Sequence, residues 1–112
     1  MQAFHIMDGP PLYTNGFLLV GDKGHAVAID PAAPAAQVEE KLAEAGGALT
    51  HILLTHGHHD HIGSVEALRS AHGAKLYMNE ADARQFGLKP DGLFEDGGVI
   101  RVDDMAFKTI FT

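Results

Sequence analysis

The sequence predicts an α/β (α+β) domain in which helices pack on one face of a mixed sheet. Short apolar runs alternate with helix-like segments in the middle of the chain, and strand pairs stand at both ends. Alternation favours parallel strands with helical crossovers, whereas the terminal pairs favour antiparallel neighbours. The 112 residues are enough for one such domain, so we expect a single domain over residues 1–112.

The first strands are expected near the N-terminus. Residues Gln2–Met7 form one apolar run, and the glycine and two prolines that follow prevent regular pairing. The segment Gly16–Asp30 predicts a hairpin, because two apolar runs flank the turn Gly21–Gly24. A helix is expected over Pro31–Gly47, with Gly46 as its C-terminal stop.

The remaining elements continue the alternation and then return to a strand pair. In order, we expect a strand over Leu49–Thr55, a helix over Ser64–Gly73, a strand over Ala74–Met78, a short helix over Glu80–Phe86, a loop over Gly87–Gly98, and an antiparallel pair from Val99–Val102 and Met105–Phe111. Asn79 suits the N-cap of the short helix and Gly87 its end.

Composition excludes several classes of function. The chain has no cysteine, so it has neither disulfides nor thiolate metal ligands. The formal charge is −7 and the basic residues are scattered, which argues against nucleic acid as a partner. The apolar runs are too short to span a membrane, and the N-terminus lacks the pattern of a signal peptide, so a cytoplasmic location is expected.

The stretch Leu54–Gly63, "LTHGHHDHIG", predicts a metal site. It places His56, His58, Asp60 and His61 where an apolar strand ends, the position at which α/β sheets commonly bind ligands. Neutral imidazole suits zinc, copper, iron or nickel. His56 and His58 are two residues apart and can point to one side, whereas the adjacent Asp60 and His61 point in different directions and address a second metal more easily.

The other histidines carry no such pattern. The spacing of His59 fits neither pair, so we expect its side chain to point away from the metals. Single histidines are usually surface or satisfied core residues, and this is the expectation for His5, His25, His51 and His72. A solvated, histidine-rich loop remains the alternative to the metal site.

The motif resembles the H-x-H-x-D-H signature of the metallo-β-lactamase fold hydrolases, and it matches at all four positions. The hairpin before "AIDPA", the helix and the "HILLTH" strand are similar to the N-terminal half of that family. The details look like the glyoxalase-II-like (hydroxyacylglutathione hydrolase-like) subgroup. The resemblance implies the N-terminal half of an αββα sandwich.

The resemblance also implies roles for particular residues. His56 and His58 would hold a first metal, and Asp60 and His61 a second, with two Zn2+ per complete site and iron or manganese as alternatives. Asp60 would also be the catalytic carboxylate that handles the proton of the nucleophile. Asp30 would orient the metal loop, although capping of the Pro31–Gly47 helix is an equal reading. The implied reaction is hydrolysis of a thioester, ester or lactone by metal-bound hydroxide, with a small-molecule acyl substrate.

The sequence departs from the family where the remaining ligands should follow. A third histidine, a bridging aspartate and a last histidine have no candidates before Thr112. We therefore expect a half-domain truncated at its C-terminus, with impaired activity and an exposed apolar sheet face. The alternatives are a homodimer through that face, a non-catalytic metal-binding half-domain, and a single-iron oxygenase acting on a persulfide.

Overall fold

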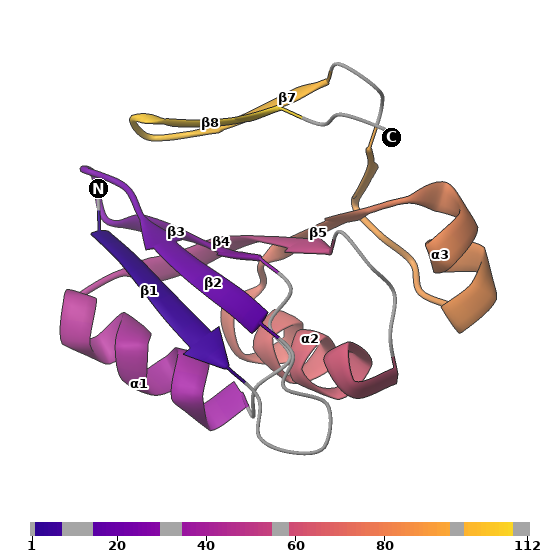
Figure 1. The fold of residues 1–112 in the computed structure, drawn as a ribbon, viewed down its shortest axis with the longest axis horizontal. Coiled ribbons are helices and arrows are strands. Elements are labelled where there is room, and N and C mark those ends of the chain that lie inside the picture. Colours follow the sequence, from indigo (N-terminus) through magenta and orange to yellow (C-terminus); the bar gives the residue numbers. More distant parts are fainter. Residues whose placement is uncertain (1, 8–14, 30–34, 55–58, 95–97, 109–112) are drawn as a thin grey trace.

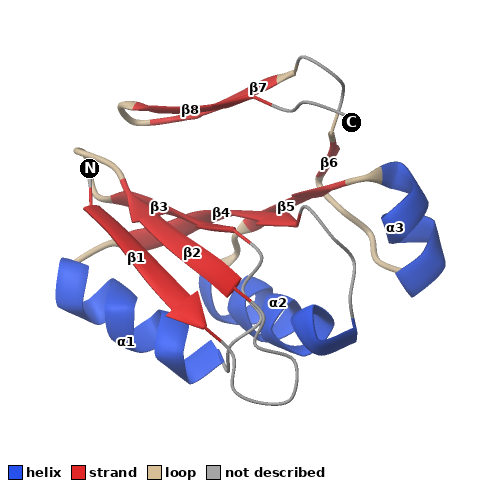
Figure 2. Cartoon of the chain, in the orientation of Figure 1, coloured by secondary structure: helices blue, strands red, loops and turns tan. Residues whose placement is uncertain are grey.

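The computed structural model describes residues 2–7, 15–29, 35–54, 59–94 and 98–108, and for residues 2–7, 15, 16, 35, 59–64, 82, 86 and 108 it describes the backbone alone. Within these residues the chain forms layers, with one large sheet between two helices and a small hairpin (Figures 1 and 2). The strands of the large sheet are β1 (Gln2–Met7), β2 (Asn15–Val20), β3 (His25–Ile29), β4 (Ala48–Leu54), β5 (Lys75–Met78) and β6 (Gly92–Leu93). The helices are α1 (Ala35–Ala45), α2 (His59–His72) and α3 (Glu80–Phe86), and the hairpin consists of β7 (Val99–Val102) and β8 (Met105–Lys108).

The large sheet is mixed, as predicted. Its strands are ordered β1-β2-β3-β4-β5-β6, with antiparallel pairing from β1 to β3 and parallel pairing from β3 to β6. The antiparallel strands are joined directly, whereas α1, α2 and α3 each connect two parallel neighbours. The carboxyl ends of β3, β4 and β5 therefore lie along one edge of the sheet.

The central strands are buried on both faces. Ala26 and Ala28 of β3 belong to a core shared with the helices, whereas Val27 between them faces the hairpin. In β4, Ile52 belongs to the core shared with the helices, and Leu53 faces the hairpin. Successive strand residues point to opposite faces, so burial on both sides requires the continuous apolar runs seen in the sequence.

The helix-facing core is formed by apolar stripes on α1 and α2 together with the sheet. Val38 and Leu42 of α1 and Val65 and Leu68 of α2 are buried against the sheet. Spacings of three and four residues place each pair on one side of its helix. No helix in the described ranges is long and apolar enough to cross a membrane.

The short helix α3 has the ends that the sequence predicted. The Asn79 side-chain oxygen accepts a hydrogen bond from the Ala81 amide at 2.7 Å, the geometry of an N-cap. Gly87 ends the helix in the left-handed conformation at φ 66°, which glycine adopts without steric cost. Gly46 ends α1 in the same way, at φ 67°.

Two expectations about element boundaries were wrong. Helix α2 begins at His59, not Ser64, so Asp60 and His61 stand in its first turn. The loop predicted over Gly87–Gly98 contains the short strand β6. β6 exists because the chain returns to β5: the Asp91 amide donates to Leu76 O at 2.8 Å, and the Asp91 carboxylate accepts from Leu76 N at 2.8 Å.

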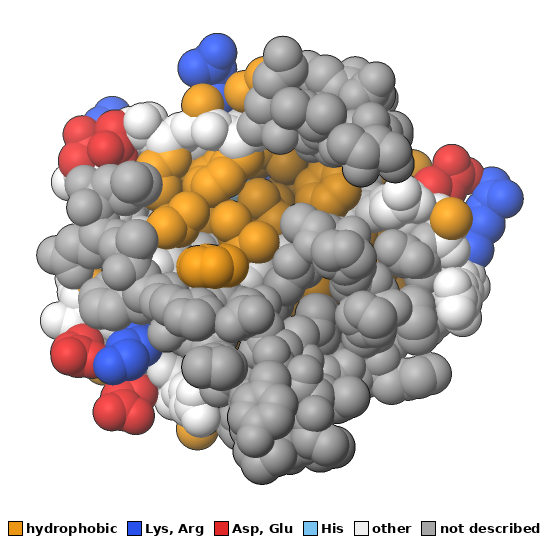
Figure 3. Space-filling view, viewed as in Figure 1, with side chains coloured by type: hydrophobic (Ala, Val, Ile, Leu, Met, Phe, Trp, Pro, Cys, Tyr) orange, Lys and Arg blue, Asp and Glu red, His pale blue; other side chains and the backbone are white. Residues whose placement is uncertain are grey.

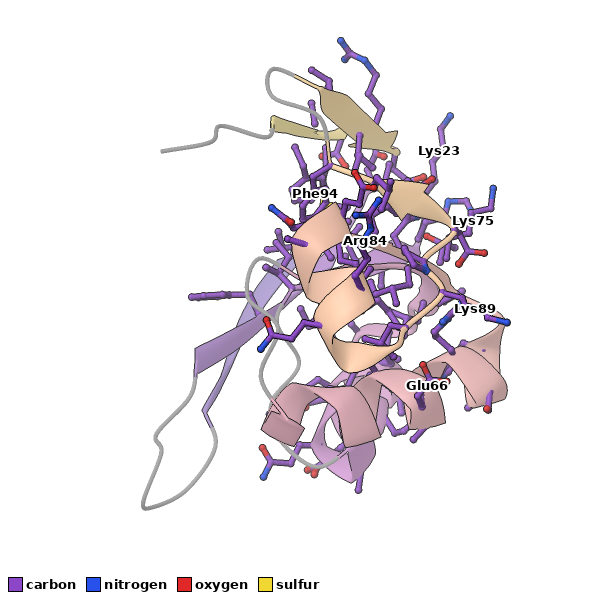
Figure 4. All side chains as sticks on the ribbon, turned by 90° about the vertical axis from the view of Figure 1, so that its right-hand side faces the viewer. Lys23, Glu66, Lys75, Arg84, Lys89 and Phe94 are labelled. Atoms are coloured by element: carbon purple, nitrogen blue, oxygen red, sulfur yellow. The ribbon has the colours of Figure 1, made fainter. Side chains whose placement is uncertain are left out.

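The β7–β8 hairpin covers part of the second face of the sheet. Val102 and Met105 of the hairpin form a buried cluster with Val27 and Leu53. Figure 4 shows the hairpin on the opposite side of the sheet from α1 and α2. Hydrophobic side chains still gather on the face seen in Figure 3, and Phe17 is 44% exposed. The expected apolar face is thus partly covered and partly exposed.

The tip of this hairpin is held to the β2–β3 turn by hydrogen bonds. The Asp103 carboxylate accepts from the amides of Lys23 and His25, both at 3.0 Å, and lies 2.6 Å from Nδ1 of the His25 ring. We call this set of contacts the Asp103 clasp. The neighbouring Asp104 accepts from the Asp22 amide at 2.9 Å. No local pattern in the sequence predicts that these two turns meet.

Replacing Leu68 by Ala should destabilise the fold strongly. The Leu68 side chain is fully buried between α2 and the sheet, so its truncation leaves a cavity and should cost about 2–5 kcal/mol. Urea denaturation followed by circular dichroism measures the free energy of unfolding. The matched control is Ser70→Ala, an exposed position on the same helix, where a change within about 0.5 kcal/mol is expected.

The Asp103 clasp should make the free energy of unfolding depend on pH in the acid range. Desolvation by burial raises the pKa of Asp103, but hydrogen bonds from the His25 ring and from the His25 and Lys23 amides outweigh it and hold the pKa below the ordinary 3.8. The ionised carboxylate therefore stabilises the fold above pH 3.8, and this contribution is lost as pH falls through the lower folded-state pKa.

The urea midpoints of the wild type and Asp103→Asn, measured from pH 7 down to pH about 2, test this linkage. The difference between them should shrink at the acid end, as pH falls through the lowered folded-state pKa of Asp103. Asp22→Asn, which alters an exposed carboxylate of the facing turn, is the control. A difference that does not change with pH would contradict the assigned role of the charge.

Candidate metal centre

In the sequence, the histidine motif follows the carboxyl end of β4, a strand with parallel neighbours on both sides. Ile29 at the end of β3 pairs with Leu53, and Leu54 pairs with Met78 at the end of β5. Three parallel strands therefore end at the same level of the sheet. Side chains that follow such strand ends converge on one region, which is where open α/β sheets bind ligands.

The four predicted ligands divide between a segment outside the described residues and the start of α2. His56 and His58 lie in residues 55–58, outside the described part of the chain, and so does Asp30. The backbone of Asp60 and His61 is helical. The sequence assigns these two residues to a different metal from His56 and His58. That assignment stays a prediction.

The chemistry of the donor set suits zinc. The motif offers three imidazoles and one carboxylate within six residues, directly after a buried strand. The helical start also explains the tolerance for an acidic residue there, because a carboxylate is favoured in the first turn of a helix. Among the side chains that the structure describes, no three His, Asp or Glu residues lie close enough together to hold a metal ion.

Three other histidines have structural partners in the described residues. His25 contacts Asp103, and His72 on α2 contacts Glu39 on α1. His51 stacks on Tyr77, with ring centroids 5.7 Å apart, and its Nδ1 lies 2.8 Å from the Thr50 hydroxyl. These contacts agree with the expectation that the isolated histidines have structural roles.

The electrostatics around His51 favour its neutral form. Burial lowers the pKa of His51, and the charges of Lys75 and His25 lower it further. Its ring faces the hairpin side of the sheet, where Tyr77 packs against the second apolar cluster. His51 therefore packs within the sheet, three residues before Leu54, where β4 ends.

A groove of about 500 Å3 lies elsewhere on the surface, between the later part of α2 and the loop after α3. Figure 4 shows its side of the molecule, with Glu66 on α2 and Lys89 in the loop. The Arg69 guanidinium in this groove already donates to Lys89 O at 3.1 Å and to the Asp91 carboxylate at 3.3 Å. Its charge therefore tethers α2 to the loop.

Comparison with known proteins decides the family. The model of the metallo-beta-lactamase superfamily matches residues 9–108. The chain belongs to the metallo-beta-lactamase superfamily. This confirms the resemblance seen in the sequence and the mixed sheet with helices that it implied.

Relatives with assigned names include hydrolases. The chain is 36% identical to the hydroxyacylglutathione hydrolase of Acidiphilium cryptum over 111 residues, covering 99% of this chain and 45% of that protein. It is 30% identical to the probable polyketide biosynthesis zinc-dependent hydrolase BaeB of Bacillus velezensis over 105 residues, covering 90% of this chain and 47% of that protein. The chain thus spans about half the length of these relatives.

Solved structures share the fold over the same portion. The B3 metallo-beta-lactamase BLEG-1 aligns with a TM-score of 0.75 and 27% identity, covering 96% of this chain and 59% of the other. ETHE1 from Myxococcus xanthus gives a TM-score of 0.75 and 26% identity, covering 96% and 47%. The chain therefore corresponds to roughly half of a metallo-beta-lactamase fold.

Removing one predicted ligand should weaken zinc binding. We expect His58→Ala to lower the affinity for zinc at least about 10–100-fold, because even the loss of an outer partner of a metal ligand costs that much. Isothermal titration calorimetry with zinc measures the affinity. His72→Gln is the control, because His72 contacts Glu39 instead. Equal losses in the two variants would contradict the assignment of His58.

Proposed function

We propose that this chain is part of a metal-dependent hydrolase with two zinc ions that cleaves a thioester, ester or lactone. The observation that carries the proposal is the complete H-x-H-x-D-H motif at the carboxyl end of β4, in a chain of the metallo-beta-lactamase superfamily. Support for the substrate class comes from the relatives named hydroxyacylglutathione hydrolase, and support for zinc from the relative named as a zinc-dependent hydrolase.

The proposed roles are those that the family resemblance implies, and the donor chemistry suits them. His56 and His58 bind the first metal through neutral imidazole nitrogen, and Asp60 and His61 bind the second. When bound, zinc acts as a Lewis acid and lowers the pKa of a coordinated water to about 7. Asp60 also accepts the proton of the attacking water as a catalytic carboxylate. β4 ends just before residues 55–58 and α2 begins just after them, so these two elements determine where the motif segment starts and ends.

A thioesterase assay tests the proposal. A chain extended past Thr112 to the length of its relatives, loaded with zinc, should release thiol from a member of a thioester panel. The 112 residues contain no cysteine, so they add no background to a thiol reagent. Asp60→Asn should lower kcat about 10²–10⁴-fold, the usual contribution of a general base. Asp22→Asn is the control carboxylate. An extended chain that binds zinc but hydrolyses no thioester, ester or lactone would contradict the substrate class.

A second candidate is a single-iron oxygenase that acts on a persulfide. The likeness to ETHE1, at 26% identity, is the observation compatible with it. The bound metal separates the two candidates: elemental analysis of protein purified without added metal should find two zinc ions per extended chain for the hydrolase and one iron for the oxygenase.

A third candidate is a non-catalytic half-domain that binds metal and forms a homodimer through its exposed sheet face. The observation in its favour is the apolar side of the sheet that the hairpin leaves partly uncovered, where Phe17 is 44% exposed. The solution mass of the 112-residue chain distinguishes it, since a monomer with catalytic activity would contradict this candidate.

A further inference from the structure

Asp103 has a backbone conformation that is unusual for a residue other than glycine. It stands in the turn between β7 and β8 at φ 53°, the left-handed region that non-glycine residues rarely adopt. Its side chain is only 4% exposed, although the turn itself lies at the surface. Aspartate tolerates this conformation better than most residues, but a buried carboxylate at a strained tip requires compensating contacts.

Those contacts come from the facing turn. Asp103 Oδ2 accepts from the amides of Lys23 and His25, and Oδ1 lies 2.6 Å from the His25 ring nitrogen. Gly21 permits the approach, because a Cβ at this position would lie 2.6 Å from both Asp103 Cβ and Oδ2. Lys23 is seen near the hairpin in Figure 4.

The two kinds of contact that hold the hairpin have different consequences. The apolar cluster around Val102 and Met105 favours docking on the sheet, but hydrophobic contact is not directional. Hydrogen bonds to a carboxylate are directional and stronger than neutral ones. The strands of the hairpin have only four residues each, so the clasp at one end determines how the whole hairpin is aligned.

The alignment points β8 toward the predicted metal site. The clasp fixes the start of β8 beside the start of β3, and Phe107 further along β8 packs on the same apolar cluster. Figure 1 shows β8 running from the tip toward the side on which β4 and β5 end. The carboxyl end of β8 is therefore directed to the edge of the sheet at which His56 follows β4 in the sequence.

We infer that Asp103 is a positioning residue for the metal edge: its carboxylate clasps the hairpin tip to the β2–β3 turn and so sets where β8 ends relative to β4 and α2. The geometric part stands on the structure alone. Its meaning for catalysis rests on the proposed function, because only that function makes the edge a metal centre.

Pulsed electron paramagnetic resonance on a doubly spin-labelled chain tests the inference. The absence of cysteine allows labels at Ala106→Cys on β8 and Ala71→Cys on α2, both exposed positions. The wild-type background should give one narrow distance distribution. Asp103→Ala should broaden it at least about twofold, since the apolar cluster alone leaves the hairpin direction unfixed.

Further variants separate positioning from stability. Asp103→Asn keeps a residue that tolerates the left-handed backbone and should give an intermediate width. Gly21→Ala leaves Asp103 intact but pushes it away from the turn, and should broaden the distribution even if Asp103→Ala fails to fold. Asp22→Ala, whose backbone amide alone takes part in the turn contacts, should keep the wild-type width.

The outcomes are distinguishable. Wild-type widths in folded Gly21→Ala and Asp103→Asn, with only the urea midpoint lowered, would overturn the inference and leave Asp103 a purely stabilising residue. Zinc titration of the same labelled chain tests the proposed function separately. If the chain binds no zinc while the widths follow the expected order, the result supports the role of Asp103 in aligning the hairpin and contradicts the proposed metal centre.

Discussion

Burial of the central strands on both faces is the constraint on which this structure depends. β3 and β4 present alternate residues to the helices and to the hairpin, and both sides are covered. Such strands are mostly apolar, and the polar residues inside β4 are held by local contacts: the Thr50 hydroxyl donates to Ala26 O, and His51 stacks on Tyr77. Functional side chains are consequently confined to the ends of these strands, and the histidine motif begins where β4 ends.

The helix that follows this strand end connects the motif to the rest of the core. α2 carries Asp60 and His61 in its first turn, and Val65 and Leu68 anchor its next turns against the sheet. Arg69 and His72 then tie its far end to the loop after α3 and to α1. The direction of α2, and with it the position of its first turn, is thus fixed by packing and polar contacts outside the motif itself.

Much of the fold could be predicted because the signals are local. The β2–β3 turn, the α1 and α2 stripes, and both ends of α3 each depend on residues within one or two turns of the chain. The start of α2 could not be predicted, because the metal motif obscures the helical pattern before Ser64. β6 was missed because a two-residue strand exists only through its pairing with β5.

The sequence by itself predicts a metal site with four candidate residues, and it places them after an apolar strand, because donor chemistry and spacing can be read from the chain. It also determined the family, which the comparisons confirm. Only the tertiary structure brought the β7–β8 turn to the β2–β3 turn. Asp103 and His25 are 78 residues apart, and a hydrogen bond between such distant residues depends on how two separate layers pack, which no local pattern records.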